Sequence, residues 1–268
     1  MGIFRRLRAR RPAVPDVPMP PLPMRQLVGL EDERFFDNPA GGLVFPDRRA
    51  RRIYDFGCGC GRVARQLVQQ REPVERYVGV DLHPGMIRWC RANLTPLAPQ
   101  FEFVHHDVEN PGFNPGPDKP KVRPLPGDDA SFDLVYAHSV FTHLRESQTP
   151  HYLGECARLL APGGVIRSTW FLFDKAQFPM MQPFQNALYI NEDDPTNAVI
   201  VDRGWLHSRL AECGLEISAA TPPAIRGFHW ALDLSRAGDA EPVELPLDEA
   251  PVGSHPPPIV AVPAAQVR

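Results

Sequence analysis

The chain has 268 residues, enough for one α/β domain with a complete core but too few for two large domains. Its formal net charge of −3 gives no overall positive field of the kind that drives nucleic-acid binding, which disfavours nucleic acid as a partner. No apolar run is long enough to cross a bilayer and the five cysteines form no C-x-x-C pair, so we expect a cytoplasmic protein with reduced thiols and no transmembrane segment.

The beginning of the chain is predicted to be a basic, proline-rich tail covering residues 1–30. Its arginines would suit an electrostatic tether to an anionic membrane, but the cluster is short and a solvated tail is the simpler interpretation. The aromatic side chains of Phe35, Phe36 and Phe45 follow. We therefore expect this segment to pack on the domain, where it could cover a ligand site.

Residues 31–235 are predicted to form the domain, because strand-like and helix-like segments alternate along them, which favours a mostly parallel sheet. The expected strands cover residues 52–56, 77–81, 101–105, 132–137, 165–171, 215–218 and 227–234. Pro84 lies where the first turn of a helix tolerates a missing N–H. A long loop, about 109–130, is interpreted as a functional flap or a mobile connection, and the remainder, 236–268, as a proline-rich tail.

A glycine-rich turn follows the expected strand at 52–56. Gly57 and Gly59 fit the dinucleotide pattern G-x-G-x-x-G, but Arg62 occupies the position of its third glycine. The pattern is instead Asp55-x-Gly57-x-Gly59-x-Gly61, in which glycine allows backbone N–H groups to approach a ligand. The leading carboxylate would repel a pyrophosphate and could hold an ammonium group.

Two further carboxylates end the next two expected strands. Asp81 lies about twenty residues beyond the turn, a position suited to the two hydroxyls of a ribose. Asp107 could accept a hydrogen bond from the exocyclic amine of an adenine while the N–H of the following residue, Val108, donates to the ring. Since the carboxyl ends of parallel strands share one edge, Asp55, Asp81 and Asp107 predict a common site for a ligand with an amino acid, a ribose and an adenine.

These motifs resemble the class I S-adenosylmethionine-dependent methyltransferases, in which an acidic residue precedes such a glycine turn. The segments Phe132-Asp133-Leu134-Val135 and Leu159-Leu160-Ala161-Pro162-Gly163-Gly164 also resemble that family. The resemblance implies a Rossmann-like α/β fold with a seven-stranded, mostly parallel sheet in the order 3-2-1-4-5-7-6, helices on both faces, and S-adenosylmethionine across the carboxyl ends of the first four strands. The implied cofactor-binding residues are Asp55, Phe56, Gly57, Cys58, Gly59, Gly61, Asp81, Leu82, Asp107, Val108 and His138.

Two histidines follow the expected strand at 132–137, where an acceptor would meet the methyl donor. His143 is the first candidate for a general base and His138 the second, because a base contributes most when the acceptor is a hydroxyl. His138 could instead line the cofactor pocket, and packing without chemistry is an equal alternative for both. Among the aromatics in and after the strand at 165–171, we assign Trp170 to the wall of the acceptor pocket.

The acceptor is predicted to be a small molecule, and methylation of one of its hydroxyl oxygens is a guess. The Asp/Asn-Pro-Pro-aromatic motif of enzymes that methylate base amines is missing after residue 135. Two alternatives remain open. His105, Asp107 and either His138 or His143 have the spacing of a non-haem iron site, although the glycine turn would then be unexplained. A non-catalytic protein that binds S-adenosylmethionine or acts as a scaffold would explain the proline-rich ends.

Overall fold

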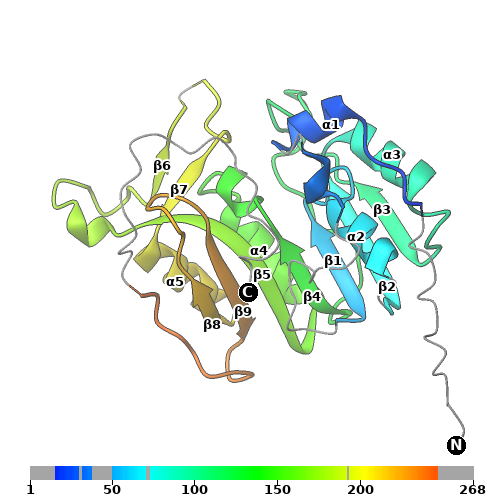
Figure 1. Cartoon of the computed structure of the whole chain (residues 1–268). Helices are drawn as coiled ribbons and strands as arrows, with labels where there is room; N and C mark the ends of the chain where they lie inside the picture. Colours follow the sequence, from blue (N-terminus) through cyan, green and yellow to red (C-terminus); the bar gives the residue numbers. More distant parts are fainter. Residues whose placement is uncertain (1–15, 30–31, 38–49, 71–72, 192, 247–268) are drawn as a thin grey trace, which may run out of the picture.

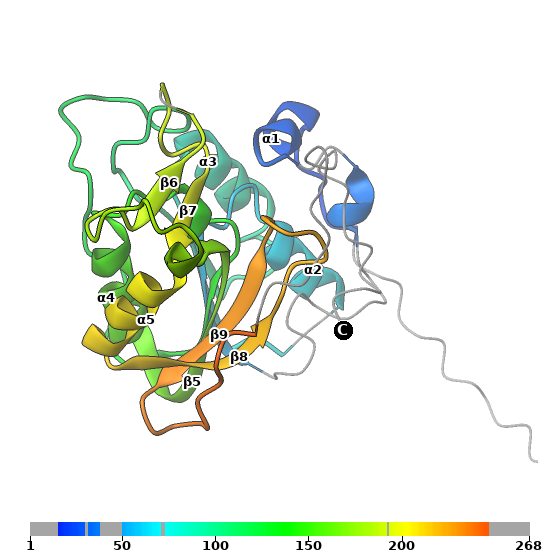
Figure 2. The same ribbon diagram turned by 90° about the vertical axis from the view of Figure 1, so that its left-hand side faces the viewer.

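The computed structural model describes residues 16–29, 32–37, 50–70, 73–191 and 193–246. Within these residues a nine-stranded sheet separates two layers of helices (Figures 1 and 2). The helices α2 (Arg62–Gln70) and α3 (Pro84–Asn93) pack on one face, and α4 (Thr149–Leu159) and α5 (Arg203–Glu212) on the other. None of the described helices is long and apolar enough to span a membrane.

The parallel part of the sheet has the predicted order β3-β2-β1-β4-β5. These strands are β1 (Arg52–Phe56), β2 (Arg76–Asp81), β3 (Phe101–His105), β4 (Phe132–Ala137) and β5 (Leu160–Phe173). The last four residues of β1 and the middle four of β2 are buried, as expected for parallel strands covered on both faces. The prediction of a Rossmann-like α/β fold is confirmed.

Beyond β5 the antiparallel part also follows the expected order. The strand β9 (Trp230–Arg236) lies between β5 and β8 (Leu215–Thr221) and is antiparallel to both. It therefore takes the place of the family's seventh strand, and β8 that of the sixth.

Two strands are additional, so the described sheet has nine strands and not seven. The hairpin of β6 (Ala187–Tyr189) and β7 (Val199–Asp202) pairs with the far end of β5 through β7. This pairing is possible because β5 has 14 residues and extends beyond β4. No strand had been expected between residues 171 and 215.

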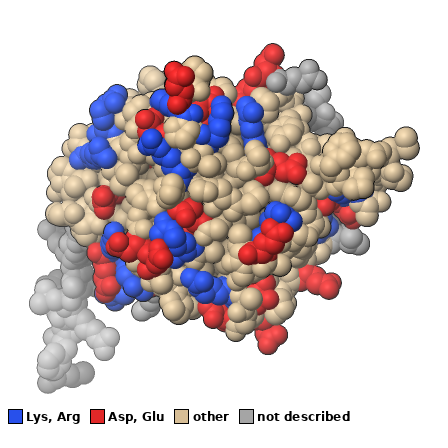
Figure 3. All heavy atoms as spheres, turned by 180° about the vertical axis from the view of Figure 1, so that it is seen from behind, with Lys and Arg blue, Asp and Glu red and all other residues tan. Residues whose placement is uncertain are grey.

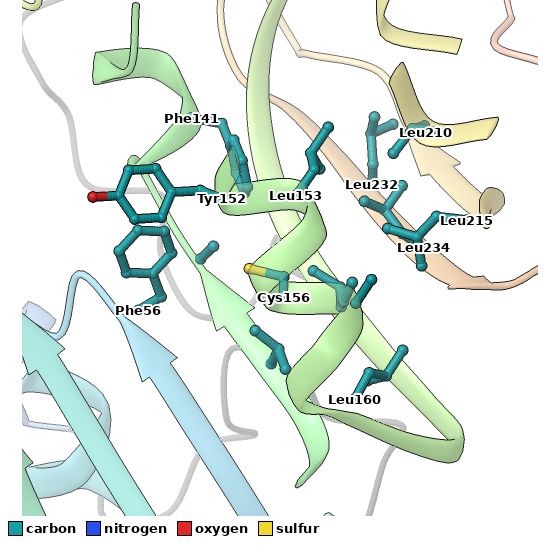
Figure 4. Packing of buried hydrophobic residues seen from close by; sticks show 14 of the residues in the cluster. Phe56, Phe141, Tyr152, Leu153, Cys156, Leu160, Leu210, Leu215, Leu232 and Leu234 are labelled. Atoms are coloured by element: carbon teal, nitrogen blue, oxygen red, sulfur yellow. The ribbon is translucent and has the colours of Figure 1, made fainter. Parts of the chain in front are cut away.

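The larger core cluster lies between the sheet and the α4–α5 layer. Tyr152, Leu153 and Cys156 of α4 face the sheet, and Phe56 and Phe141 lie against them (Figure 4). The ring centroids of Phe56 and Tyr152 are 5.1 Å apart. This packing fixes the end of β1 and the segment after β4 relative to one another.

The helix α3 begins as the sequence predicted. Pro84 occupies the first turn, and the side chain of His83 accepts hydrogen bonds from the N–H groups of Gly85 and Met86. The long loop after β3 is held at several points: Glu109 N–H donates to Pro120 O at 2.9 Å, and Leu125 is buried. The loop therefore has a defined path in the structure.

The N-terminal segment packs on α2 and on the glycine turn, and Figure 2 shows its helix α1 (Leu22–Leu27) on the same side of the sheet as α2. Phe36 is fully buried and clusters with Cys60 and Met86, which confirms that this aromatic packs on the domain. Val17 is buried too, so the packed part starts within residues 1–30, which had been assigned to a tail. Phe45 and most of both predicted tails lie outside the described residues.

One buried cation, Arg65 of α2, holds this segment. Its guanidinium donates hydrogen bonds to Val17 O at 2.9 Å and Pro18 O at 3.0 Å, and to Phe36 O and the Asp37 carboxylate at 2.5 Å each. The Arg65 side chain is only 5% exposed. Four acceptors therefore depend on one guanidinium.

Replacing Arg65 by Ala is expected to lower the free energy of unfolding by about 3 kcal/mol, because the buried carbonyls lose a charged donor. Urea denaturation followed by circular dichroism measures this change. Arg51→Ala is the matched control: Arg51 pairs with Glu75 through side chains that are both 56% exposed, so its loss should cost less than about 1 kcal/mol. Equal losses in the two variants would contradict this role of Arg65.

Candidate active site

The carboxyl ends of β1 to β4 meet at one edge of the sheet. In the parallel register Phe56 lies beside Val80, Asp81 beside His105 and Asp55 beside Tyr136. The glycine turn, the segment after β2, the loop after β3 and the segment after β4 therefore leave the sheet side by side (Figure 1). This is the edge at which open α/β sheets bind ligands.

The glycine turn has a backbone that favours glycine. Gly57, Gly59 and Gly61 have φ angles of +82°, +53° and +79°. A Cβ atom at Gly57 would collide with the side chain of Val140, and one at Gly61 would lie 2.5 Å from Leu94 Cδ1. The turn is thus in direct contact with the segment after β4.

The amides of this turn are bound within the protein. Gly57 N–H and Cys58 N–H both donate to Val80 O, at 2.7 and 3.0 Å, and Gly59 N–H donates to Asp81 Oδ2 at 2.8 Å. The expectation that these N–H groups reach a ligand therefore finds no support in this arrangement. The glycines instead give the turn its shape and bring it close to Val140.

Asp81 organises the edge between β1 and β2. Its two carboxylate oxygens accept from Gly59 N–H and, at 2.7 Å, from His83 N–H. Burial raises its pKa, and these two backbone hydrogen bonds oppose the rise. Each carboxylate oxygen has a second lone pair, so Asp81 can still accept from a ligand hydroxyl. The neighbouring Leu82 O contacts His105 Nε2 at 3.0 Å.

Asp55 is buried beneath the turn. Its exposure is 2%, and its Oδ2 accepts a hydrogen bond of 2.5 Å from the Tyr77 hydroxyl. Burial raises the pKa of Asp55 to about 7, while the Tyr77 hydrogen bond and the charge of Arg62 act in the opposite direction. Near neutral pH the protonated and ionised forms of this carboxyl are therefore both populated, and a nearby cation would favour the ionised form.

Asp107 lies in the loop that follows β3 and is more exposed than the other two acids. Its Oδ1 accepts from Asn114 Nδ2 and Lys119 Nζ, each at 3.0 Å, and these hydrogen bonds lower its pKa. Its side chain is 45% exposed. The N–H of the next residue, Val108, donates to His106 O at 2.8 Å and is therefore engaged within the loop.

His138 lies in a ring stack on the α2 side of the sheet. It is parallel to Tyr136 with centroids 6.0 Å apart, and 5.6 Å from the ring of His229, which stacks on Phe171. Burial, with the charge of Arg62, holds the pKa of His138 well below its ordinary value, so the ring is neutral. This arrangement suits a ring that lines a pocket.

His143 is held in one tautomer by the β6–β7 hairpin. Its Nδ1 lies 2.9 Å from Thr196 O, and a carbonyl can only accept, so Nδ1 carries the proton. In the neutral ring Nε2 is then the acceptor, and it faces Ser139 Oγ at 3.3 Å. Ser139 has a φ of +56°, which is rare for a residue other than glycine and is frequent at functional sites.

Trp170 is not placed as predicted. It has no exposed surface, its ring stacks on Phe141 at 4.3 Å, and its Nε1 donates to Ser168 Oγ. A residue enclosed in this way offers no surface to an acceptor. Trp170 therefore belongs to the core and not, as predicted, to the wall of the acceptor pocket. The reason is strand parity, because Trp170 points to the same face of β5 as Ile166, towards α4.

The non-haem iron alternative is not supported by the described residues. No cluster of three His, Cys, Asp or Glu side chains among them could hold a metal ion. His105 faces Leu82 O, and Asp107 faces Lys119. The spacing in the sequence therefore does not bring the ligands together.

Sequence reasoning missed two residues of this site. Arg62 follows the last glycine directly, and its charge acts on Asp55, Tyr136 and His138. The residue had been noted only as a departure from the dinucleotide pattern. His229 precedes β9 and carries no motif, and burial lowers its pKa to about 4. No signal in the sequence links it to His138.

The comparisons with known proteins agree with this fold. A family model described as "Methyltransferase domain" matches residues 53–164. The tRNA1(Val) (adenine(37)-N6)-methyltransferase of Yersinia pestis is 34% identical over 64 residues, which are 24% of this chain and 25% of that protein. The chain thus spans about a quarter of the length of the curated relatives it matches.

Solved structures add a likeness of fold. The O-methyltransferase from the trans-AT PKS multienzyme of Brevibacillus brevis, in complex with S-adenosyl-L-homocysteine, has a TM-score of 0.50 at 14% identity over 68% of this chain and 53% of that chain. An O-methyltransferase family protein from Burkholderia thailandensis has a TM-score of 0.46 at 17% identity over 80% of this chain and 55% of that chain.

The matched family model begins in β1 and ends in β5, so it includes the glycine turn, Asp81, Asp107 and the two histidines after β4. The sheet order, with an antiparallel β9 between β5 and β8, is the one expected for the same family. Residues 53–164 thus match a methyltransferase domain, and the described sheet has the strand order expected for the class I S-adenosylmethionine-dependent methyltransferases.

Proposed function

We propose that this protein transfers the methyl group of S-adenosylmethionine to a hydroxyl of a small molecule. The observation that carries the proposal is the contact between Gly57 and Val140. It sets the segment with His143, whose Nε2 makes a hydrogen-bond contact only with Ser139 Oγ among the described residues, beside the turn expected to hold the cofactor. A base next to the methyl donor is what methylation of a hydroxyl requires.

The three carboxylates fit the parts of the cofactor. Asp55, with a pKa of about 7, would ionise beside an ammonium group and hold it, directly or through water. Asp81 would accept from the ribose hydroxyls with its remaining lone pairs. Asp107 is half-exposed, and its Oδ2 accepts no hydrogen bond from a described residue, so it could take one from the adenine amine.

The remaining pocket residues follow from the same placement. We propose that His138 lines the cofactor pocket with its neutral ring, and that Phe56, Cys58 and Leu82 support the turn from below.

Methyl transfer is a direct displacement on an electrophilic methyl carbon that the sulfonium of the cofactor supplies. The chain must align the acceptor oxygen and remove its proton. His143 Nε2 would take that proton, and the cofactor would supply the methyl group, with a methyl ether and S-adenosylhomocysteine as the products. The carbonyl of Thr196 stabilises the resulting imidazolium, because it accepts from Nδ1–H.

A small molecule is favoured over tRNA as the acceptor. Basic and acidic side chains alternate over the face seen in Figure 3, with no extended basic area for a phosphate backbone. The residues after β4, Tyr136-Ala137-His138-Ser139, lack the motif of amine-directed enzymes. The free thiols of all five cysteines support a cytoplasmic location as part of the same proposal.

The test is turnover. The full chain with S-adenosylmethionine and a fractionated metabolite extract should release S-adenosylhomocysteine in at least one fraction. Catalysis would be attributed to this site if the release is lost in Asp81→Ala. Tight cofactor binding without product in any fraction would favour the rival interpretation, a non-catalytic cofactor-binding or scaffolding protein. Product from tRNA alone would contradict the small-molecule acceptor.

Gly59→Val is expected to weaken cofactor binding more than tenfold. The residue has a φ of +53°, and an added Cβ would lie 3.2 Å from Val28 Cγ1, so the variant strains the turn and displaces the segment above it. Isothermal titration with S-adenosylhomocysteine measures the change. Gly163→Val is the matched control, since Gly163 has a φ of +70° but no atom within 4 Å of an added Cβ. Wild-type affinity in Gly59→Val would contradict the placement of the cofactor.

A further inference from the structure

A pocket is lined by residues of the β6–β7 hairpin and of the segment that follows His143. Its volume is about 770 Å³, within the range of small-molecule sites. Its walls come from the start of α4, the loop between β6 and β7, and α5. None of the residues assigned above to the cofactor or to proton transfer lines it. The pocket thus shares no residue with those assigned to the proposed methyl-transfer site.

Two cations of this pocket lack a full set of partners. The half-buried guanidinium of Arg145 contacts no acidic group among the described residues. Arg209 pairs with Glu212 at 2.6 Å through one terminal nitrogen, but its Nε is buried and no described acceptor reaches it. A buried N–H without an acceptor costs free energy that a bound anion would recover.

Other polar groups of the pocket also favour an anion. Glu146 is its acidic lining residue, and this carboxylate already accepts from Asn186 Nδ2 at 2.9 Å. Glu146 N–H donates to the Tyr189 oxygen at 3.2 Å, so the Tyr189 hydroxyl keeps its own proton for a ligand. The pocket also includes the positive end of the 11-residue helix α4.

Two aromatic rings complete the lining. The guanidinium of Arg209 lies over the ring of Trp205, 6.0 Å from its centroid, and Tyr189 lies on the hairpin side with 41% of its surface exposed. Aromatic faces of this kind bind flat, apolar bodies. A ligand with a ring and an anionic group would therefore match both features of the pocket.

We propose that this pocket binds a small aromatic anion, with its carboxylate or phosphate on Arg145 and Arg209 and its ring against Trp205 and Tyr189. The ligand contacts the hairpin that also supplies Thr196 O to His143, through the adjacent lining residue Pro195. The proposal concerns binding alone and is independent of whether the chain transfers methyl groups.

Titration of the full chain with benzoate, phenyl phosphate and benzyl alcohol tests the site. Binding is followed by the fluorescence of Trp205, which Trp205→Phe identifies among the four tryptophans. Saturable binding of an anionic probe, at least tenfold tighter than that of the neutral alcohol, is expected. The two anions separate a carboxylate site from a phosphate site, and either result supports the proposal.

Arg145→Gln should weaken the preferred anion at least tenfold, and Arg209→Gln provides a second, independent variant. Arg88→Gln is the matched control, because Arg88 is exposed on α3, away from the pocket. The preferred anion should still bind when the protein is saturated with S-adenosylhomocysteine. Equal binding of alcohol and anions, or affinities unchanged in both pocket variants, would overturn the proposal.

Discussion

Replacement of His143 by Ala should lower kcat for methyl transfer by about 10²- to 10⁴-fold, the usual contribution of a positioned general base. The loss follows from the geometry, since Thr196 O fixes the proton on Nδ1 and leaves Nε2 to accept the proton of the acceptor. The dissociation constant of S-adenosylhomocysteine should change less than threefold or so, because the residue is needed for the acceptor and not for the cofactor. Single-turnover kinetics and calorimetry measure the two quantities.

Two variants sharpen this experiment. His151→Ala is a matched control, because His151 contacts only Arg123 O at 2.8 Å among acceptors of the described residues and has no proposed role in cofactor binding or proton transfer. Its kcat should equal that of the wild type. His138→Ala should instead weaken cofactor binding, as expected for a ring in the pocket wall. If His143→Ala kept the wild-type kcat while His138→Ala lost it, the base would be His138.

The central strands and the positions of Asp55, Asp81 and Asp107 could be predicted from the sequence because both depend on local patterns. The strand β2 ends in Asp81, Asp107 follows β3 by two residues, and β1 leads into a glycine turn after Asp55; parallel topology then brings these positions to one edge. The start of α3 at Pro84 was equally local, because it depends on a single backbone N–H. These features require no knowledge of the distant parts of the chain.

The failures concern contacts between distant segments. The β6–β7 hairpin forms only because β5 extends past β4, and nothing in residues 187–202 alone indicates that partner. Trp170 was assigned to a pocket by residue type, but the pleat of β5 turns it into the core. His229 joins His138 from a segment about ninety residues away, a proximity set by the antiparallel pairing of β9 with β5.

The β6–β7 hairpin also orients the candidate base, His143. His143 lies in the short helix η2 (Phe141–His143), which alone would leave its ring free to take either tautomer. Thr196 holds the ring, and Asp194 and Asn110 in turn hold the Thr196 hydroxyl, at 2.6 and 3.3 Å. The additional strands thus connect the loop after β3, the hairpin and the proposed base in one hydrogen-bonded network.

Cofactor affinity should rise with pH until about pH 7, because Asp55 must lose its proton to hold the ammonium group. Its pKa in the free protein is raised to about 7, chiefly by burial. Below that value binding releases a proton, so the dissociation constant should fall by up to about tenfold per pH unit between about pH 5.5 and about pH 7 and then level off. The ammonium itself stays protonated up to about pH 7.5.

Asp55 should contribute the opposite trend to the stability of the free protein. A carboxyl whose folded pKa is raised from 3.8 to about 7 keeps its proton in the folded state after the unfolded chain has lost it. Its contribution to the unfolding free energy is therefore highest below about pH 4, falls as the pH rises towards about 7, and is constant above that value. The lowered pKa values of His138 and His229 act in the opposite direction over part of this range, so the contribution of Asp55 is measured as the difference in thermal unfolding between the wild type and Asp55→Asn.

Asp55→Asn should remove the contribution of Asp55 to both pH dependences and weaken cofactor binding at pH 7.5 by about ten- to a hundredfold, since an uncharged amide replaces a charge-assisted hydrogen bond. Tyr77→Phe should shift both inflections to higher pH, because its hydroxyl donates to Asp55 Oδ2 and lowers the pKa of that carboxyl. Calorimetry in two buffers of different ionisation enthalpy counts the proton released on binding. An Asp55→Asn variant that still releases this proton would assign it to another group and remove Asp55 from the ammonium site.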